Sequence, residues 1–106
     1  TTTRKELIAR GERIIDNIPK NKIKVLGITL EESLVEAGSG SLPVKSIPSV
    51  ALKFRPNKSS VSSLAKAFRL GSYPVVGYTQ GNVFYIDLKA VLPRQISHLI
   101  DSIKQV

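Results

Sequence analysis

The chain has 106 residues, 42% of them hydrophobic and 23% charged, and it contains no cysteine and one histidine. This composition predicts one folded domain, excludes disulfides and thiolate chemistry, and argues against a metal cluster. The net charge of +8 favours a polyanionic partner such as RNA, although a basic face covered elsewhere in a larger protein would explain it equally well.

The hydropathy of the chain bears on its cellular location, and its first residue bears on whether it is a fragment. There is no apolar run long enough to span a bilayer and no signal segment, so we expect a cytoplasmic protein without membrane contact. The chain begins at Thr1 and lacks methionine, which we interpret as the sign of a fragment of a longer polypeptide.

The first predicted helix has an apolar stripe at helical spacing and ends before Pro19. The stripe consists of Leu7, Ile8, Gly11, Ile14, Ile15 and Ile18. Because Gly11 lies within it, we expect this helix to pack closely on its neighbour. We interpret residues 1–20 as a connector helix and residues 21–106 as a small domain.

Strand patterns follow. Residues 23–30 and 31–37 are each predicted to form a short strand. Residues 49–55 alternate, with Val50, Leu52 and Phe54 on one side, which is typical of a half-buried strand. Pro48 near its start and Pro56 past its end occupy positions that a sheet tolerates.

The second half of the chain predicts a helix, a hairpin and a last helix. Ser59 or Ser60 can cap a helix with the stripe Val61, Leu64, Ala65 and Phe68, closed by Gly71. Residues 75–79 and 83–88 flank Gln80, Gly81 and Asn82, which predicts a hairpin with Phe84, Ile86 and Leu88 pointing inward. Pro93 opens a helix whose apolar residues are Ile96, Leu99, Ile100 and Ile103. This order predicts an α+β fold, a small and mainly antiparallel sheet with helices packed on one face.

The segment EAGSGSLPVKSIPSV, residues 36–50, resembles a phosphate-binding loop only superficially. It lacks the Gly-Lys-Ser/Thr ending of a P-loop, Pro43 stands where a dinucleotide fingerprint needs glycine, and no helix pattern follows. Two interpretations stay open, a structural turn leading into the next strand and a loop that faces a ligand.

Basic residues recur through the middle of the chain as candidates for contact with nucleic-acid phosphates. They are Lys53, Arg55, Lys58, Lys66 and Arg69. A solvated basic rim is the alternative. His98 is expected to be solvated. Asp87 and Lys89 are expected to form a surface ion pair, and the alternative is that Lys89 faces a site. The three tyrosines could stack on nucleic-acid bases. Paired carboxylates, a Ser-His-Asp arrangement and metal-ligand spacing are missing, so the isolated chain is not expected to be an enzyme.

Several motifs together resemble one family. GSGSLP, IPSVALKF, AFRLG and YPVVGYTQGNVFYIDLKAVLP, followed by a helix, are similar to the C-terminal domain of bacterial L-seryl-tRNA(Sec) selenium transferase, also called selenocysteine synthase. The resemblance runs from about Ile23 to the end, and the first helix fits the connector that enters this domain.

The resemblance implies a fold-type I pyridoxal phosphate enzyme, of which this chain is the small C-terminal domain. The parent would convert seryl-tRNA(Sec) to selenocysteinyl-tRNA(Sec) with selenophosphate, using pyridoxal phosphate as electron sink while the serine hydroxyl leaves. The cofactor lysine would lie upstream, in the large domain, and no cofactor is expected on this chain. The small domain would close over the site and help to hold a homo-oligomer together.

The resemblance also implies which residues face the cofactor and substrate pocket. The loop 38–43 would approach it, with Ser39, Gly40 and above all Ser41 as candidates, together with Tyr78 and Lys89. The family often carries arginine at the positions of Tyr78 and Lys89. Tyr78 therefore removes a cation, whereas Lys89 keeps the positive charge but lacks the two parallel N–H donors with which arginine binds an oxyanion. The alternatives are the small domain of a related pyridoxal phosphate enzyme that acts on a free amino acid, and an independent basic RNA-binding module.

Overall fold

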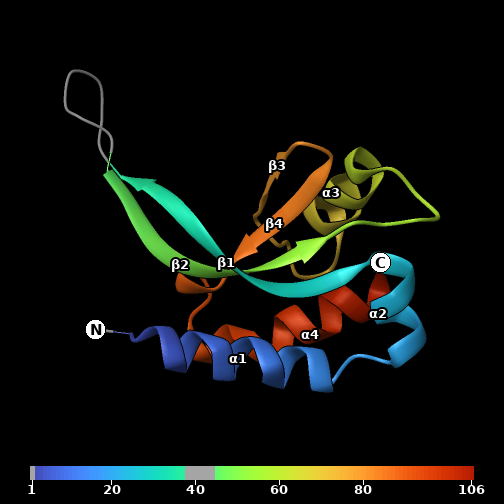
Figure 1. The fold of residues 1–106 in the computed structure, drawn as a ribbon. Helices are drawn as coiled ribbons and strands as arrows, with labels where there is room; N and C mark the ends of the chain where they lie inside the picture. The colour runs from blue at the N-terminus through green and yellow to red at the C-terminus, as the bar shows by residue number, and fades with distance from the viewer. Residues whose placement is uncertain (1, 38–44) are drawn as a thin grey trace.

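The computed structural model describes residues 2–37 and 45–106, and for residues 34–37 and 45–47 it describes the backbone alone. Its elements follow one another along the chain (Figure 1). They are α1 (Arg4–Asp16), α2 (Lys20–Leu26), β1 (Ile28–Ala37), β2 (Lys45–Phe54), α3 (Val61–Leu70), β3 (Tyr78–Gln80), β4 (Val83–Asp87), the 3-10 turns η1 (Leu88–Ala90) and η2 (Pro93–Gln95), and α4 (Ile96–Gln105).

The four strands form one sheet in the order β1-β2-β4-β3, and every neighbouring pair is antiparallel. β1 and β2 pair from Ile28↔Phe54 to Ala37↔Lys45, whereas β4 pairs only with residues 51–54 of β2. The β1–β2 hairpin therefore extends beyond the rest of the sheet as a curved two-stranded ribbon (Figure 1). The predicted small antiparallel sheet is confirmed.

One face of the sheet carries the core. Leu52 and Phe54 of β2 lie opposite Ile86 and Phe84 of β4, and all four are almost completely buried. Phe68 of α3 packs on this face, with its ring centroid 5.5 Å from that of Phe54 and 5.4 Å from that of Phe84. Helices therefore cover the face on which these alternating apolar side chains stand, which confirms the predicted α+β class.

Helix α1 lies along the same face, beside α4 (Figure 1). The Thr3 hydroxyl caps α1 by accepting a hydrogen bond of 3.1 Å from the Glu6 N–H. A Cβ at Gly11 would overlap Leu30 Cδ1 and lie 3.0 Å from Leu88 Cδ1, so a larger residue here would have to displace the Leu30 side chain. Both the predicted helix and its close packing are confirmed.

The predicted strand at residues 23–30 is wrong in its first half. Residues 20–26 form α2, which starts after Pro19 and ends at Gly27 in the left-handed conformation, with φ of 59°. A Cβ at Gly27 would also lie 2.2 Å from the Arg55 carbonyl oxygen. β1 starts only at Ile28 and runs unbroken to Ala37, so the two predicted short strands are one.

The second half of the chain follows the prediction with smaller differences. Ser60, rather than Ser59, caps α3 by accepting a 3.0 Å hydrogen bond from the Ser63 N–H. The turn at Gly81 and Asn82, with φ of 56° and 62°, has the positive angles typical of a type I′ hairpin. The strand before it is shorter than predicted, because the Val75 N–H donates to the Phe68 carbonyl instead of joining the sheet.

Two further boundaries differ from the prediction. Gly71 follows α3 in an extended conformation, with φ of −69°, and not in the left-handed one. Pro48 lies inside β2 instead of near its start. Since β4 reaches only residues 51–54, one edge of β2 has no neighbour at Pro48 among the described strands, which suits a residue without an N–H.

Candidate functional site

The predicted pocket-facing residues fall into separate places. Ser39, Gly40 and Ser41 lie outside the described residues. Tyr78 is the first residue of β3, and Lys89 lies in η1. Tyr78 does not line the cavity that Lys89 lines. A shared role of these five residues stays a prediction.

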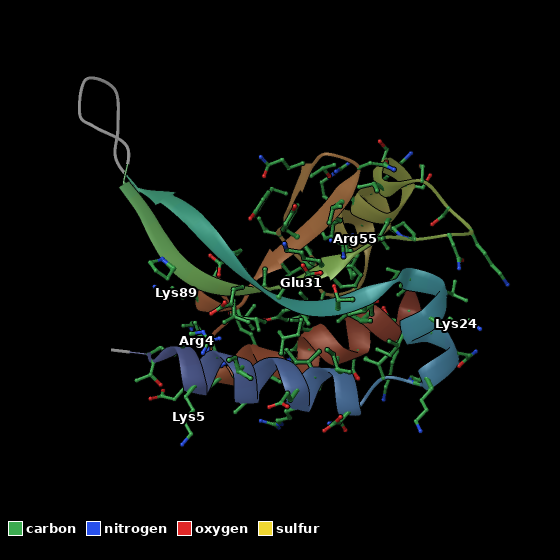
Figure 2. All side chains as sticks on the ribbon, in the orientation of Figure 1. Arg4, Lys5, Lys24, Glu31, Arg55 and Lys89 are labelled. Atoms are coloured by element: carbon green, nitrogen blue, oxygen red, sulfur yellow. The ribbon has the colours of Figure 1, made fainter. Side chains whose placement is uncertain are left out.

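Lys89 lines a cavity of about 190 Å³ between the start of α1, β2 and η1. The other lining residues are Thr2, Arg4, Leu7, Pro48 and Ser49. Figure 2 shows Arg4 and Lys89 at the same end of the molecule, above the N-terminus of α1. Arg4 forms an ion pair with Glu32 through Nε. Lys89 is therefore the lining cation without an ion pair among the described residues, and its ammonium is chemically suited to an oxyanion.

Asp87 holds two of the lining residues of this cavity in place. Its Oδ1 accepts hydrogen bonds from the Ser49 hydroxyl at 2.5 Å and from the Lys89 N–H at 3.0 Å. Ser49 is 4% exposed, so this bond satisfies a buried hydroxyl. Within the described part of the chain, Asp87 forms no ion pair with the Lys89 ammonium, so of the two sequence interpretations the surface ion pair is not the one observed.

Arg10 fixes the turn that presents Lys89. Its Nη1 donates to the carbonyl oxygens of Leu88 at 3.1 Å and Val91 at 2.8 Å. Sequence reasoning did not select Arg4, Arg10 or Ser49, because their partners lie 28 to 81 residues away in the chain. No local motif connects residues at that distance.

The face of the sheet opposite the helices carries an aromatic pair. Tyr78 and Tyr85 are cross-strand partners whose rings stack with centroids 4.8 Å apart and planes within 2°. The Lys53 ammonium lies 5.2 Å from the Tyr85 ring centroid, on the next strand. Burial, and then the charges of Asp87 and Tyr85, raise the pKa of Tyr78 above its ordinary value.

Glu31 pairs with two of the predicted phosphate ligands on this open face and compensates one of their two charges. It accepts from Thr29 Oγ1 at 2.6 Å and Arg55 Nη1 at 3.0 Å, and Lys53 Nζ lies 3.4 Å from its second oxygen (Figure 2). The hydrogen bonds from Thr29 and Arg55, with the Lys53 charge, lower the Glu31 pKa from 4.5 to about 2. Lys53 and Arg55 are therefore already matched by an acid.

The other three predicted phosphate ligands have no such acid. Lys58, Lys66 and Arg69 are exposed, and none of them forms an ion pair with a residue that the structure describes. The sequence contains no Asp or Glu between Glu36 and Asp87. The structure thus divides the five candidates into a pair on the sheet that shares one carboxylate and an uncompensated group on and before α3.

The remaining sequence candidates can be placed briefly. His98 is exposed, and its ring stacks on Tyr73 with centroids 4.0 Å apart. Across residues 2–37 and 45–106, no three His, Asp or Glu side chains gather in a way that could bind a metal ion. The helices in the described ranges are all too short or too polar to cross a membrane.

Known proteins that are similar to this chain belong to one family. Residues 1–92 match the family model for L-seryl-tRNA selenium transferase. The L-seryl-tRNA(Sec) selenium transferase of Edwardsiella ictaluri (strain 93-146) is 33% identical over 89 residues, which cover 81% of this chain and 19% of that protein. The enzyme of the same name from Moorella thermoacetica is 30% identical over 94 residues, covering 85% of this chain and 20% of that protein. The chain thus spans about a fifth of the length of these curated relatives, and it belongs to the L-seryl-tRNA selenium transferase family.

Proposed function

We propose that this chain is the C-terminal, non-catalytic domain of a full-length L-seryl-tRNA(Sec) selenium transferase, in which it contacts tRNA. The full-length enzyme would be cytoplasmic and homo-oligomeric, and would make selenocysteinyl-tRNA(Sec) from seryl-tRNA(Sec) and selenophosphate. The similarity over 81% of this chain but only 19% of the Edwardsiella protein supports a domain with most of the enzyme outside it.

The described residues do not fit the attachment site of pyridoxal phosphate. Covalent attachment needs a lysine amine that is enclosed and available to the cofactor. Among lysines with described side chains, only Lys22 and Lys53 are partly buried. The Lys22 ammonium donates to the carbonyls of Lys104 and Val106, and that of Lys53 lies beside Glu31. The proposal therefore assigns the cofactor lysine to the larger part of the enzyme.

The observation that carries the proposed tRNA contact is the uncompensated charge on α3. Lys66 and Arg69 are three residues apart on one helix, so their side chains are neighbours, and Lys58 lies in the segment before the Ser60 cap. Cations without an acidic partner keep their full attraction for phosphates, whereas Lys53 and Arg55 would first have to leave Glu31.

A salt titration tests this contact. Binding of the chain to tRNA(Sec) and tRNA(Ser) would be measured across a range of salt concentrations, for the wild type and for Lys66→Ala/Arg69→Ala. The slope of log K against log salt should fall by about 2 in the double variant if both cations contact phosphates. The control Lys5→Ala/Lys24→Ala removes two exposed cations from α1 and α2 and should leave the slope unchanged. Equal decreases in both variants would show a diffuse field and contradict the α3 contact.

We also propose that Lys89 faces the substrate pocket of the full-length enzyme and binds an oxyanion. The cavity that it shares with Arg4 and Ser49 supports this assignment. In the full-length enzyme, Lys89→Met should lower selenium transfer roughly tenfold to a hundredfold, as expected for a lost hydrogen bond to a charged group. Lys89→Arg should retain most of the activity, and tRNA binding should stay unchanged in both. Unaltered transfer in Lys89→Met would exclude the role.

The competing function, action on a free amino acid, needs its own test. The full-length enzyme should release the serine hydroxyl from seryl-tRNA(Sec) and not from free serine. Turnover of free serine at a comparable rate would favour the related pyridoxal phosphate enzyme instead.

A further inference from the structure

Five large apolar side chains are exposed within the described residues, and four of them lie within residues 70–78. They are Leu70, Tyr73, Val76, Tyr78 and Leu92, with Val76 the most exposed at 89%. Scattered exposed apolar residues are ordinary, but those that border an apolar groove mark an interaction surface.

Two of these residues, Tyr73 and Val76, line a groove of about 210 Å³. The segment 73–76 forms one wall, and Ile86, Val91 and Leu99 belong to the rest of the lining. The lining contains no charged side chain. We call this feature the apolar groove. Its size and chemistry suit an aliphatic or aromatic side chain.

The wall of the apolar groove is held in place from several sides. The Ser102 hydroxyl donates to the Tyr73 carbonyl at 3.0 Å, and the Tyr73 ring stacks on His98. At the other end, a Cβ on Gly77 would lie 2.4 Å from both the Phe84 ring and the Tyr85 carbonyl oxygen, so the backbone there is tightly packed. Val76 is therefore presented by a fixed segment, and an occupant would not have to order it.

The charges disfavour two kinds of occupant. The groove lining contains no Lys or Arg in a chain of net charge +8, so the groove itself offers no cation to the phosphates of RNA. A second copy of the chain would bring another +8, which opposes association of the isolated chain. An uncharged segment of protein outside this chain meets neither objection.

We infer that the apolar groove docks an apolar segment from the larger remaining part of the full-length selenium transferase. The inference rests on the proposed function in one respect, namely that this chain is one domain of that enzyme. About four-fifths of each curated relative lies outside the matched region, so most of the polypeptide is available to supply this segment.

Cysteine labelling tests the inference without disturbing the fold. The chain has no cysteine, so Val76→Cys introduces a single thiol on it, and Leu70→Cys gives a matched control that is 70% exposed and outside the groove lining. Both thiols should react quickly with a maleimide in the 106-residue chain. In the full-length enzyme, the rate at position 76 should fall at least tenfold, while that at position 70 should stay within twofold.

Other results would overturn the inference and name a different occupant. Equal labelling rates of Val76→Cys in the two proteins would show an uncovered groove. Protection in the 106-residue chain that rises with its concentration, with a dimer mass by light scattering, would assign the groove to a second copy. Protection that appears only with tRNA would assign it to RNA. A failed salt-slope test on Lys66 and Arg69 would leave all of these readings intact, so the two proposals fail separately.

Discussion

The two faces of the sheet use the same strands for different purposes. On the face under the helices, Phe54 and Phe84 are partners on adjacent strands and are 0% and 3% exposed. On the open face, the next pair along is Lys53 and Tyr85, and it is followed across β1 by the Thr29–Glu31 network. Successive residues of β2 thus point to opposite faces, one into an enclosed aromatic cluster and the next onto a polar surface.

This difference indicates that the covered face provides the stability of the fold and that the open face provides its surface chemistry. The covered face combines close ring packing with nearly complete burial, so we expect it to provide most of the free energy of unfolding. The charged groups of the open face form exposed or half-buried ion pairs, whose net contributions are small. Substitutions on the two faces should therefore differ in size, and each prediction below tests that contrast.

The largest effect is expected at Phe54. Phe54→Ala should lower the free energy of unfolding by about 3–5 kcal/mol, because it opens a cavity between the rings of Phe68 and Phe84. Urea denaturation followed by circular dichroism gives this value. Tyr78→Ala, on the open face, is the control and should cost about 1 kcal/mol or less. Similar losses at the two positions would refute the division between the faces.

An intermediate effect is expected where α1 meets the covered face. Gly11→Val should destabilise the chain by about 1–3 kcal/mol, because its side chain would overlap Leu30 and Leu88. The same denaturation experiment applies. Ala9→Val adds the same side chain on the exposed side of α1 and should cost less than about 1 kcal/mol. If the Gly11 variant were as stable as the Ala9 variant, α1 would not be packed as closely as described.

The smallest effect is expected at Glu31, and it should depend on pH. The Glu31 pKa is lowered to about 2 in the folded chain, so its contribution is complete above its ordinary value of 4.5 and is lost as the pH falls through about 2. Because the Glu31 side chain is 39% exposed, the contribution should stay below about 1 kcal/mol.

Comparison of the wild type with Glu31→Gln isolates this contribution. The difference in the free energy of unfolding should be visible at pH 6 and should shrink between pH 4.5 and pH 2. A difference that stays constant over this range would mean that Glu31 acts through packing and not through its charge.

Much of the fold was predictable because its signals are local. The stripe of α1, the alternation around Phe54, the Ser60 cap and the Gly81-Asn82 turn each depend on residues close together in sequence. The error at α2 has a physical reason. Ile23 and Val25 favour a strand by intrinsic propensity, while the helix is determined by Pro19 before it and the left-handed Gly27 after it.

The candidate site was predictable only in part. Lys89 was selected through the family resemblance, whereas Arg4 and Ser49 join its cavity from other elements. The five basic candidates were identified as one group because sequence does not show that Glu31 lies beside two of them. Long-range pairing of charges distinguishes the cations beside an acid from the others, and a single sequence carries no signal for it.

The strand order also has a consequence for folding kinetics. The hairpins β1–β2 and β3–β4 join neighbours in the chain and can each form on the microsecond timescale. The two hairpins pair with each other through β2 and β4, and Arg10 donates hydrogen bonds to carbonyls 78 and 81 residues away. Both kinds of contact require the closure of long loops. We therefore expect the folding rate to be limited by the step in which the two hairpins pair and α1 packs on them.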